Sequence, residues 1–187
     1  KVADKYEARI GLDMAASEYY ENGEYKISSM HQTLEGDDYL DFVQKLIDEF
    51  DLVYVEDPFD QDDFHYHAKL TSKNPEVLVC GDDLFVTQEK RLREGIENRA
   101  GNSLIVKPNQ IGTVSDAKET VELAKENDYV PVISHRSGET CDATIADLAL
   151  EWEIPVIKAG IADIRIAKLN QLIRHEDKQD NPEVSGF

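Results

Sequence analysis

Short apolar runs that end in a polar or charged side chain recur along this sequence. Residues 104–106 are apolar and mostly β-branched, and the run ends at Lys107 and breaks at Pro108. This pattern is typical of a buried strand with a cation at its carboxyl end. Five further runs of the same kind end at Asp13, Glu56, Asp82, Ser134 and Lys158. The pattern therefore predicts six buried strands with polar chemistry at their carboxyl ends.

Amphipathic segments separate these runs. Over residues 37–50 the apolar positions recur at steps of three and four, which predicts a helix with one buried face. After the first strand, Asn22 and Gly23 form a strong turn signal and predict a small hairpin. The remaining helices are predicted up to residue 71 and over residues 88–98, 115–126, 141–152 and 164–174. The strands are predicted over residues 9–14, 52–56, 77–80, 103–107, 130–134 and 154–158.

The spacing of the strand ends indicates how the strands are connected. From Glu56 onward they follow one another at intervals of roughly 25 residues, the length of one strand, one helix and two loops. Polar chemistry at the ends of successive parallel strands is typical of a (β/α)8 barrel site. The alternative, a doubly wound open sheet, gathers its site at one switch point. The predicted fold class is α/β, a partial TIM barrel with six of its eight strands.

Composition and charge narrow the choice of partners. The 187 residues are enough for one ordinary domain with a real core. The 39 acidic and 20 basic residues give a formal net charge of −19, which argues against nucleic acid or an anionic membrane as the main partner. No apolar run reaches the roughly 18 residues of a membrane span, and no signal peptide is found. The acidity suits cation binding or solubility at high salt, and a strongly solvated surface explains it equally well.

The cysteines indicate the redox compartment of the protein, and the first residue indicates whether the chain is a piece of a longer one. Cys80 and Cys141 form no C-x-x-C pair and are interpreted as reduced thiols of a cytoplasmic protein, with Cys80 in a strand core. The chain begins at Lys1 instead of methionine, which indicates a processed or excised piece.

Three carboxylates, Asp13, Glu56 and Asp82, lie at three predicted strand ends. Taken singly, a strand-end carboxylate is more often a cap or a loop hydrogen-bonding group than a ligand. Closure of a barrel would bring these three to one point, where oxygen ligands with room for water and substrate suit magnesium. The sequence therefore predicts a magnesium site at this edge of the sheet.

Two lysines lie at the ends of later strands. At a buried strand end, the ammonium groups of Lys107 and Lys158 would lose their hydration. This loss is costly unless an anion lies close by. Together with His135 and Arg136, they predict an anionic substrate held between a cationic wall and a metal. Lys107 is the candidate general base, because Lys158 and a metal nearby favour its neutral form. Arg136 and Ser137 are the candidate phosphate contacts.

Other polar residues are less informative. His65 and His67 are predicted to lie in a loop, solvated and without a metal. Asp62 and Asp63 resemble a ligand pair, but they can equally begin the following helix as a cap.

Several long motifs in the chain resemble those of the enolase family. The matching motifs run in the family's order from residue 10 to about residue 176. They are GLDMAASE (11–18), EDPFDQDD (56–63), GDDL (81–84), KPNQIGT (107–113), SHRSGET (134–140) and AKLN (167–170) with LIR (172–174). Motifs of this length are very specific.

The resemblance implies the reversible dehydration of 2-phosphoglycerate to phosphoenolpyruvate. It implies that Lys107 removes the proton next to the carboxylate and that Lys158 binds the carboxylate. It also implies the remaining roles, namely Asp13, Glu56 and Asp82 on magnesium, His135 on the substrate, and Arg136 and Ser137 on the phosphate and a second magnesium. The parent protein is expected to be a cytoplasmic homo-oligomer, a dimer or larger.

Two departures from the family pattern matter. The N-terminal α+β domain and the early barrel strands, with glutamates that help to expel the hydroxyl group, have no counterpart here. Residues 159–165 form a shorter run than the family usually has. We therefore expect residues 1–176 to form an incomplete enolase barrel with little activity alone, followed by a polar tail over 177–187. The alternatives are a non-catalytic enolase-like scaffold and another acid-sugar dehydratase of the enolase superfamily.

Overall fold

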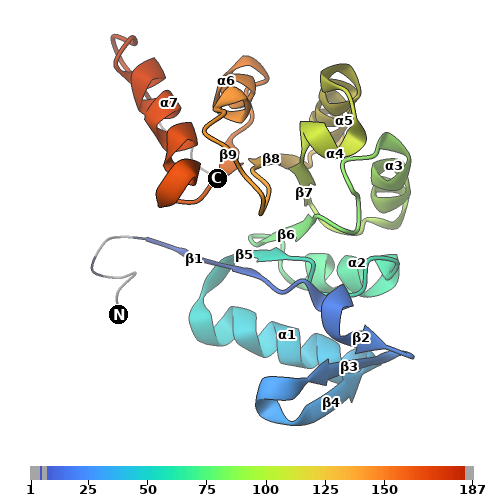
Figure 1. The fold of residues 1–187 in the computed structure, drawn as a ribbon. Coiled ribbons are helices and arrows are strands. Elements are labelled where there is room, and N and C mark those ends of the chain that lie inside the picture. The colour runs from blue at the N-terminus through green and yellow to red at the C-terminus, as the bar shows by residue number, and fades with distance from the viewer. Residues whose placement is uncertain (1–4, 6–7, 184–187) are drawn as a thin grey trace.

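Six parallel strands form one curved sheet in the computed structural model, which describes residue 5 and residues 8–183 (Figure 1). The strands of this sheet follow one another in chain order, without the reversal that a doubly wound sheet requires. They are β1 (Ile10–Asp13), β5 (Leu52–Glu56), β6 (Leu78–Gly81), β7 (Ser103–Val106), β8 (Val130–Ser134) and β9 (Val156–Lys158). The predicted partial barrel is confirmed.

The main helices lie on the convex side of the sheet (Figure 1). They are α1 (Gly36–Phe50), α2 (Phe64–Lys73), α3 (Glu89–Asn98), α5 (Val114–Glu126), α6 (Thr144–Glu151) and α7 (Ile166–Glu176). Two short helices, α4 (Pro108–Ile111) after β7 and the 3-10 turn η4 (Asp163–Arg165) after β9, were not predicted separately. Among the described residues, no helix has the length and apolar character needed to cross a membrane.

One helix boundary differs clearly from the prediction. The helix expected over residues 141–152 begins at Thr144. The polar residues before it form turns of their own. The Asp142 carboxylate accepts a hydrogen bond from the Thr144 backbone N–H (2.8 Å), and the Thr140 hydroxyl accepts one from the Asp142 backbone N–H (3.1 Å). Short polar side chains compete with the helix in this way at N-termini.

A small antiparallel sheet is inserted between β1 and α1. It consists of β2 (Tyr20–Glu21), β3 (Glu24–Ile27) and β4 (Gln32–Glu35). The predicted turn is present, since Asn22 and Gly23 adopt φ angles of 55° and 92°. The third strand was missed. Tyr25 fastens this sheet to α1 by stacking on Tyr39, with the ring centroids 3.6 Å apart.

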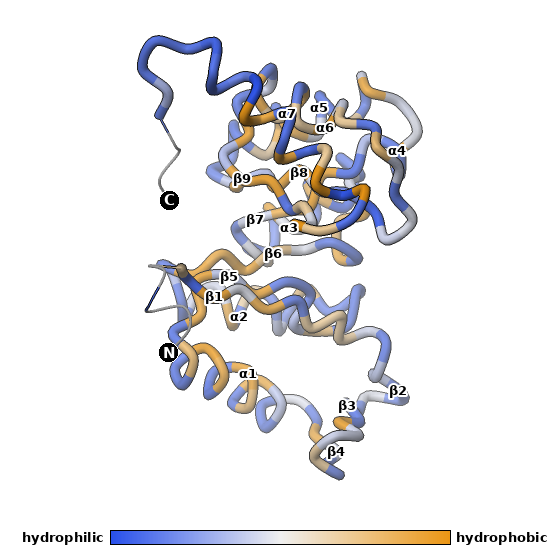
Figure 2. The backbone as a smooth tube through the Cα atoms, turned by 60° about the vertical axis from the view of Figure 1, so that its left-hand side comes forward, coloured by the Kyte–Doolittle hydropathy of each residue, from blue (hydrophilic) through white to orange (hydrophobic). Residues whose placement is uncertain are grey.

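The core has two layers because strand side chains alternate between the faces of the sheet. Cys80, Ile105 and Val132 share a cluster on one face, which places Cys80 in the strand core as expected. Val79 and Leu104 point the other way and pack in the clusters that include the helices. Figure 2 shows the corresponding apolar stretches in the strands and the alternation of apolar and polar residues along α1.

Candidate active site

The predicted site residues gather at one edge of the curved sheet. Parallel strands all present their carboxyl ends at the same edge, so residues at those ends share it. Asp13, Glu56 and Lys158 are the last residues of β1, β5 and β9, and Asp82, Lys107 and His135 directly follow β6, β7 and β8.

Lys158 links the two outermost strands of the sheet. Its Nζ atom donates to Asp13 Oδ2 (2.7 Å) and to both carboxylate oxygens of Glu56 (2.8 Å). Asp13 and Glu56 are register partners on β1 and β5, whereas Lys158 belongs to β9 at the far edge. Burial opposes the charge of Lys158, but the hydrogen bonds to Asp13 and Glu56 outweigh it and raise the pKa of the ammonium group. Lys158 is therefore a fixed cation at neutral pH.

Lys107 and Asp82 form a second ion pair. Their side chains are 14% and 15% exposed, and Lys107 Nζ donates to Asp82 Oδ2. The other oxygen, Asp82 Oδ1, is buried and has no hydrogen-bond partner within the described part of the chain. A buried acceptor without a partner is costly and marks a place for a ligand.

Glu56, Asp57 and Asp82 together form a candidate metal centre. Each offers one carboxylate oxygen, and these oxygens lie within 4.8 Å of one another. Hard divalent cations take oxygen ligands of this kind, and the unpartnered Asp82 Oδ1 fits such an ion. Asp13, which the sequence predicts as the third ligand, lies outside this group and binds Lys158 instead.

Asp57 has a supporting position within this cluster. Its two carboxylate oxygens accept the backbone N–H groups of Asp82 (2.8 Å) and Asp83 (2.9 Å). Burial raises the pKa of Asp57 to about 7, against the lowering effect of these two hydrogen bonds. Because both oxygens are engaged, we interpret Asp57 as the residue that orients Asp82.

His135 lies at the junction with the last strand. Its backbone N–H donates to the Lys158 carbonyl (3.1 Å), and no described residue bonds its buried Nδ1 atom. Burial lowers the pKa of His135; the Glu139 carboxylate raises it in part, and the nearby cations Arg165, Lys158 and Lys168 lower it again. The imidazole is therefore neutral at pH 7, with a ring nitrogen left for a ligand.

Arg136 and Ser137 lie in the loop that follows β8. The Arg136 backbone N–H donates to the Glu139 carboxylate (2.7 Å), and its guanidinium donates to the Asn109 side chain (3.1 Å). The Ser137 carbonyl accepts a hydrogen bond from Arg165 (3.0 Å). A hollow of about 440 Å³ beside this loop is lined in part by Arg136 and Glu139. The start of the loop is thus held by side chains from other segments.

Several supporting residues were missed at the sequence level. Tyr54 donates to Glu56 (2.5 Å), and its position two residues earlier in β5 puts it on the same strand face. Thr87 is fully buried at a φ of 56° and accepts the Lys107 backbone N–H (2.9 Å). Because side chains two residues apart on a strand share a face, the position of Tyr54 could have been predicted from that of Glu56. No local feature of the sequence points to Thr87.

The two histidines of α2 were placed wrongly. Both lie in the helix, and His67 is fully buried instead of solvated. The helix begins early because Asp63 caps it, accepting the Tyr66 backbone N–H (2.9 Å). His67 Nδ1 bonds the Asp63 carbonyl (2.7 Å), and burial lowers the pKa of His67 to about 4. His67 is therefore a core residue.

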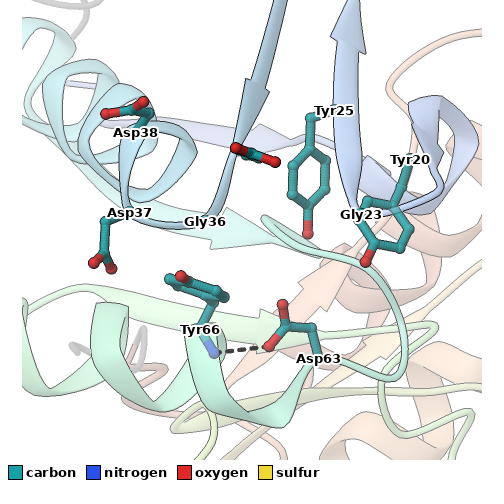
Figure 3. Close-up of a pocket in the computed structure, with 9 residues that line it drawn as sticks. Tyr20, Gly23, Tyr25, Gly36, Asp37, Asp38, Asp63 and Tyr66 are labelled. Carbon is teal, nitrogen blue, oxygen red and sulfur yellow. Dashed lines mark hydrogen bonds between the residues drawn. The ribbon is translucent and has the colours of Figure 1, made fainter.

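A separate surface hollow of about 430 Å³ lies away from the strand ends. Carboxylates and tyrosines from the small sheet, the start of α1 and the start of α2 surround it (Figure 3). Tyr66 faces it from α2 and Asp63 from the position just before that helix, joined by the cap hydrogen bond, and Tyr25 faces it from β3. None of the predicted site residues lines this hollow.

Comparison with known proteins identifies the family. The profile of the family described as enolase, C-terminal TIM barrel domain, matches residues 2–184. Curated relatives named enolase include one from Natronomonas pharaonis, 51% identical over 173 residues, covering 91% of this chain and 43% of the relative. Others are from Methanosphaera stadtmanae (50% over 181 residues, 94% and 43%) and Halobacterium salinarum (49% over 182 residues, 95% and 45%).

The extent of these matches also defines what the chain contains. It spans less than half the length of the curated relatives that it matches, and nearly all of its own length lies in the match. The parallel sheet in chain order and the polar strand ends agree with the domain described for the family. The chain therefore belongs to the enolase family, and it matches the family's C-terminal TIM barrel domain.

Proposed function

We propose that the protein to which this chain belongs catalyses the reversible dehydration of 2-phosphoglycerate to phosphoenolpyruvate. The observation that carries this proposal is the pairing of two lysines with three strand-end carboxylates at one edge of the sheet. Lys158 contacts Asp13 and Glu56, and Lys107 contacts Asp82. Such an edge can hold an anionic acid and remove a proton from it.

Lys107 is the general base in this proposal. It removes the proton from the carbon next to the substrate carboxylate. Its ammonium group donates to the Oδ2 oxygen of Asp82, and the Thr87 hydroxyl accepts its backbone N–H.

Magnesium is the proposed metal. Glu56 and Asp82, with Asp13, would hold it, and Ser137 would hold a second ion together with the substrate. Bound magnesium would stabilise the negative charge that develops on the substrate carboxylate as the proton leaves. The support from the chain itself concerns Glu56 and Asp82, whose carboxylate oxygens lie close together with one of Asp57, and the buried Asp82 Oδ1, which has no hydrogen-bond partner among the described residues. Asp13 lies outside this group and enters the proposal through the family resemblance.

The other residues bind and orient the substrate. Lys158 is a fixed cation for the carboxylate, and Arg136 with Ser137 contacts the phosphate. His135 offers a neutral ring with a free nitrogen beside Lys158. These positions hold the substrate at its two charged ends, so that the carbon to be deprotonated lies between them.

The proposal extends to the whole protein. Because the curated relatives are more than twice as long as the matched region, we expect this chain alone to bind magnesium and substrate weakly and to turn over slowly. A cytoplasmic location and a homo-oligomeric parent protein complete the proposal. Neither nucleic acid nor a membrane is a partner in it.

The test is magnesium-dependent formation of phosphoenolpyruvate from 2-phosphoglycerate, followed by the absorbance of the enol phosphate. We expect slow formation by the chain that stops when magnesium is chelated and is absent in Lys107→Ala. Calorimetric titration with magnesium should show binding by both proteins. Formation that continues unchanged in Lys107→Ala, or a chain that binds neither magnesium nor the substrate, would contradict the proposal.

A further inference from the structure

Lys168 in α7 is a buried lysine for which the proposed reaction has no direct use. Its side chain is 1% exposed, which places it among the largest fully buried side chains. An ammonium group loses its hydration when it is buried, so it must have strong partners inside the protein. Lys168 has two such partners, and both belong to the loop that follows β8.

The first partner is Glu139, whose carboxylate forms an ion pair with Lys168 through Oε2. The other oxygen of Glu139 accepts the Arg136 backbone N–H at 2.7 Å. The second partner is the Thr140 carbonyl, at 2.8 Å from Lys168 Nζ. Lys168 is thus connected through one side chain to the backbone of Arg136.

The segment just before Lys168 makes a further contact with the same loop. Arg165, at the end of η4, donates from Nη2 to the Ser137 carbonyl at 3.0 Å. The loop is therefore held at Ser137, Glu139 and Thr140 by residues 165–168. These contacts hold the loop on both sides of Ser137 and reach the Arg136 backbone through Glu139.

The same stretch of chain also continues from the strand that ends at Lys158. The Lys158 carbonyl accepts the His135 backbone N–H (3.1 Å) at the start of the loop. Residues 158–168 thus contact the loop at its first residue, His135, and again at Ser137, Glu139 and Thr140. The proposed carboxylate contact and the proposed phosphate contacts consequently belong to one connected unit.

Stability alone is a poor explanation for this ion pair. Replacing a buried ion pair by apolar side chains of similar volume often leaves a protein equally or more stable. The buried pair does give geometry, since Lys168 and Glu139 fix donor and acceptor directions that an apolar pair would leave free. Binding of a substrate at two charged ends depends on such geometry.

We infer that Lys168 is a positioning residue, which through Glu139 and Thr140 holds the loop that presents Arg136 and Ser137 to the substrate phosphate. This inference rests on the proposed function, because it assigns the loop to the phosphate end of 2-phosphoglycerate. Lys168 touches neither the substrate nor the metal in this scheme.

The experiment compares two ligands and four proteins. With magnesium in excess, affinities for 2-phosphoglycerate and for glycerate, which lacks the phosphate, are measured by NMR titration. The proteins are the unaltered chain, Lys168→Met, Glu139→Gln and the control Lys125→Met. Lys125 also donates to a backbone carbonyl, that of Trp152 (2.5 Å), but it lies outside the loop contacts described above.

We expect Lys168→Met to bind 2-phosphoglycerate roughly tenfold more weakly while glycerate affinity stays the same. Glu139→Gln keeps an acceptor for the Arg136 N–H, so its affinity for 2-phosphoglycerate should fall less than that of Lys168→Met. Lys125→Met should bind both ligands as the unaltered chain does. Hydrogen exchange at the Arg136 amide should become faster in Lys168→Met and stay unchanged in Lys125→Met.

The outcomes separate the inference from the proposed function. Unchanged 2-phosphoglycerate affinity in Lys168→Met would overturn the inference alone. An equal loss for both ligands would also overturn it, because a general loss of structure weakens both ends alike. An unaltered chain that binds neither ligand would overturn the proposed function, and the inference with it.

Discussion

His67 is fully buried, and its burial makes the stability of the fold depend on pH. Its pKa is lowered to about 4 by burial, whereas an unfolded histidine titrates near pH 6.5. Between these values the unfolded state binds the proton first, so stability falls as the pH falls from about 6.5 to about 4 and then levels off. The shift corresponds to about 3 kcal/mol.

The substitution His67→Asn should remove this part of the pH dependence. Asparagine can keep the donor to the Asp63 carbonyl but does not titrate. Urea unfolding at several pH values should therefore show the stability difference between the two proteins shrinking by about 3 kcal/mol from pH 7 to pH 4. His65→Asn, on the exposed side of α2, is the matched control. A constant difference across this range would refute the assignment.

At the level of single residues, the candidates that the sequence singled out were charged residues in otherwise apolar surroundings. A lysine or a carboxylate directly after an apolar β-branched run is such a residue, and Lys107, Glu56 and Lys158 were found in this way. Glu139 and Lys168 were not, because each is an ordinary polar residue in its own segment. Their significance lies in a contact between residues 29 positions apart, and spacing along the chain does not reveal such a contact.

The packing of α3 against Phe85, in the segment that follows β6, depends on a glycine. A Cβ atom at Gly95 would lie 2.4 Å from Phe85 Cε1 and 2.9 Å from its Cζ, and Phe85 is fully buried. Gly95→Ala should therefore lower the free energy of unfolding by about 1–3 kcal/mol through overpacking. This loss should exceed the gain of up to about 1 kcal/mol that alanine gives a helix.

The adjacent substitution Glu94→Ala is the control, since Glu94 is exposed on the same helix. It should change the free energy of unfolding by no more than about 0.5 kcal/mol. Both variants can be compared by their urea midpoints. A Gly95→Ala protein as stable as the unaltered chain would show that Phe85 can move aside, and the packing argument would be wrong.

Long periodic elements were predicted better than short polar ones. The helix over residues 37–50 and the strand over 130–134 match α1 and β8 to within one residue. Strand β4 (Gln32–Glu35) was missed because its residues are mostly polar and show no apolar alternation. It forms because β3 lies beside it and supplies hydrogen-bond partners, which is a tertiary cause.

The order of the strands in the whole molecule was predicted from the spacing of their ends. What the sequence could not give was the curvature of the sheet. Lys158 on β9 contacts Asp13 on β1, which requires the two outermost strands to approach across the sheet. That approach depends on the twist and coiling of all six strands together.

The net charge of −19 has a consequence for the stability of the whole molecule. Like charges repel one another more in the compact state than in the unfolded chain. Potassium chloride should therefore raise the melting temperature, as the screening length falls from about 10 Å at 0.1 M to about 3 Å at 1 M. Calorimetry in the presence of a chelator separates this effect from magnesium binding.

The control for this prediction is the same salt series at the sequence pI of about 4.5. The net charge is close to zero there, so the increase with salt should nearly vanish. An equal increase at both pH values would assign the effect to apolar burial instead of charge screening.

The central claim is that the strand ends of this chain bind a phosphorylated acid with magnesium and that Lys107 removes its proton. Exchange of deuterium from solvent into the carbon next to the carboxylate of 2-phosphoglycerate tests this most directly, because it requires proton removal but no loss of the hydroxyl group. We predict exchange, measured by NMR in heavy water, that needs magnesium and disappears in Lys107→Ala. Exchange at an equal rate in Lys107→Ala, or none in the unaltered chain saturated with magnesium and substrate, would contradict the account.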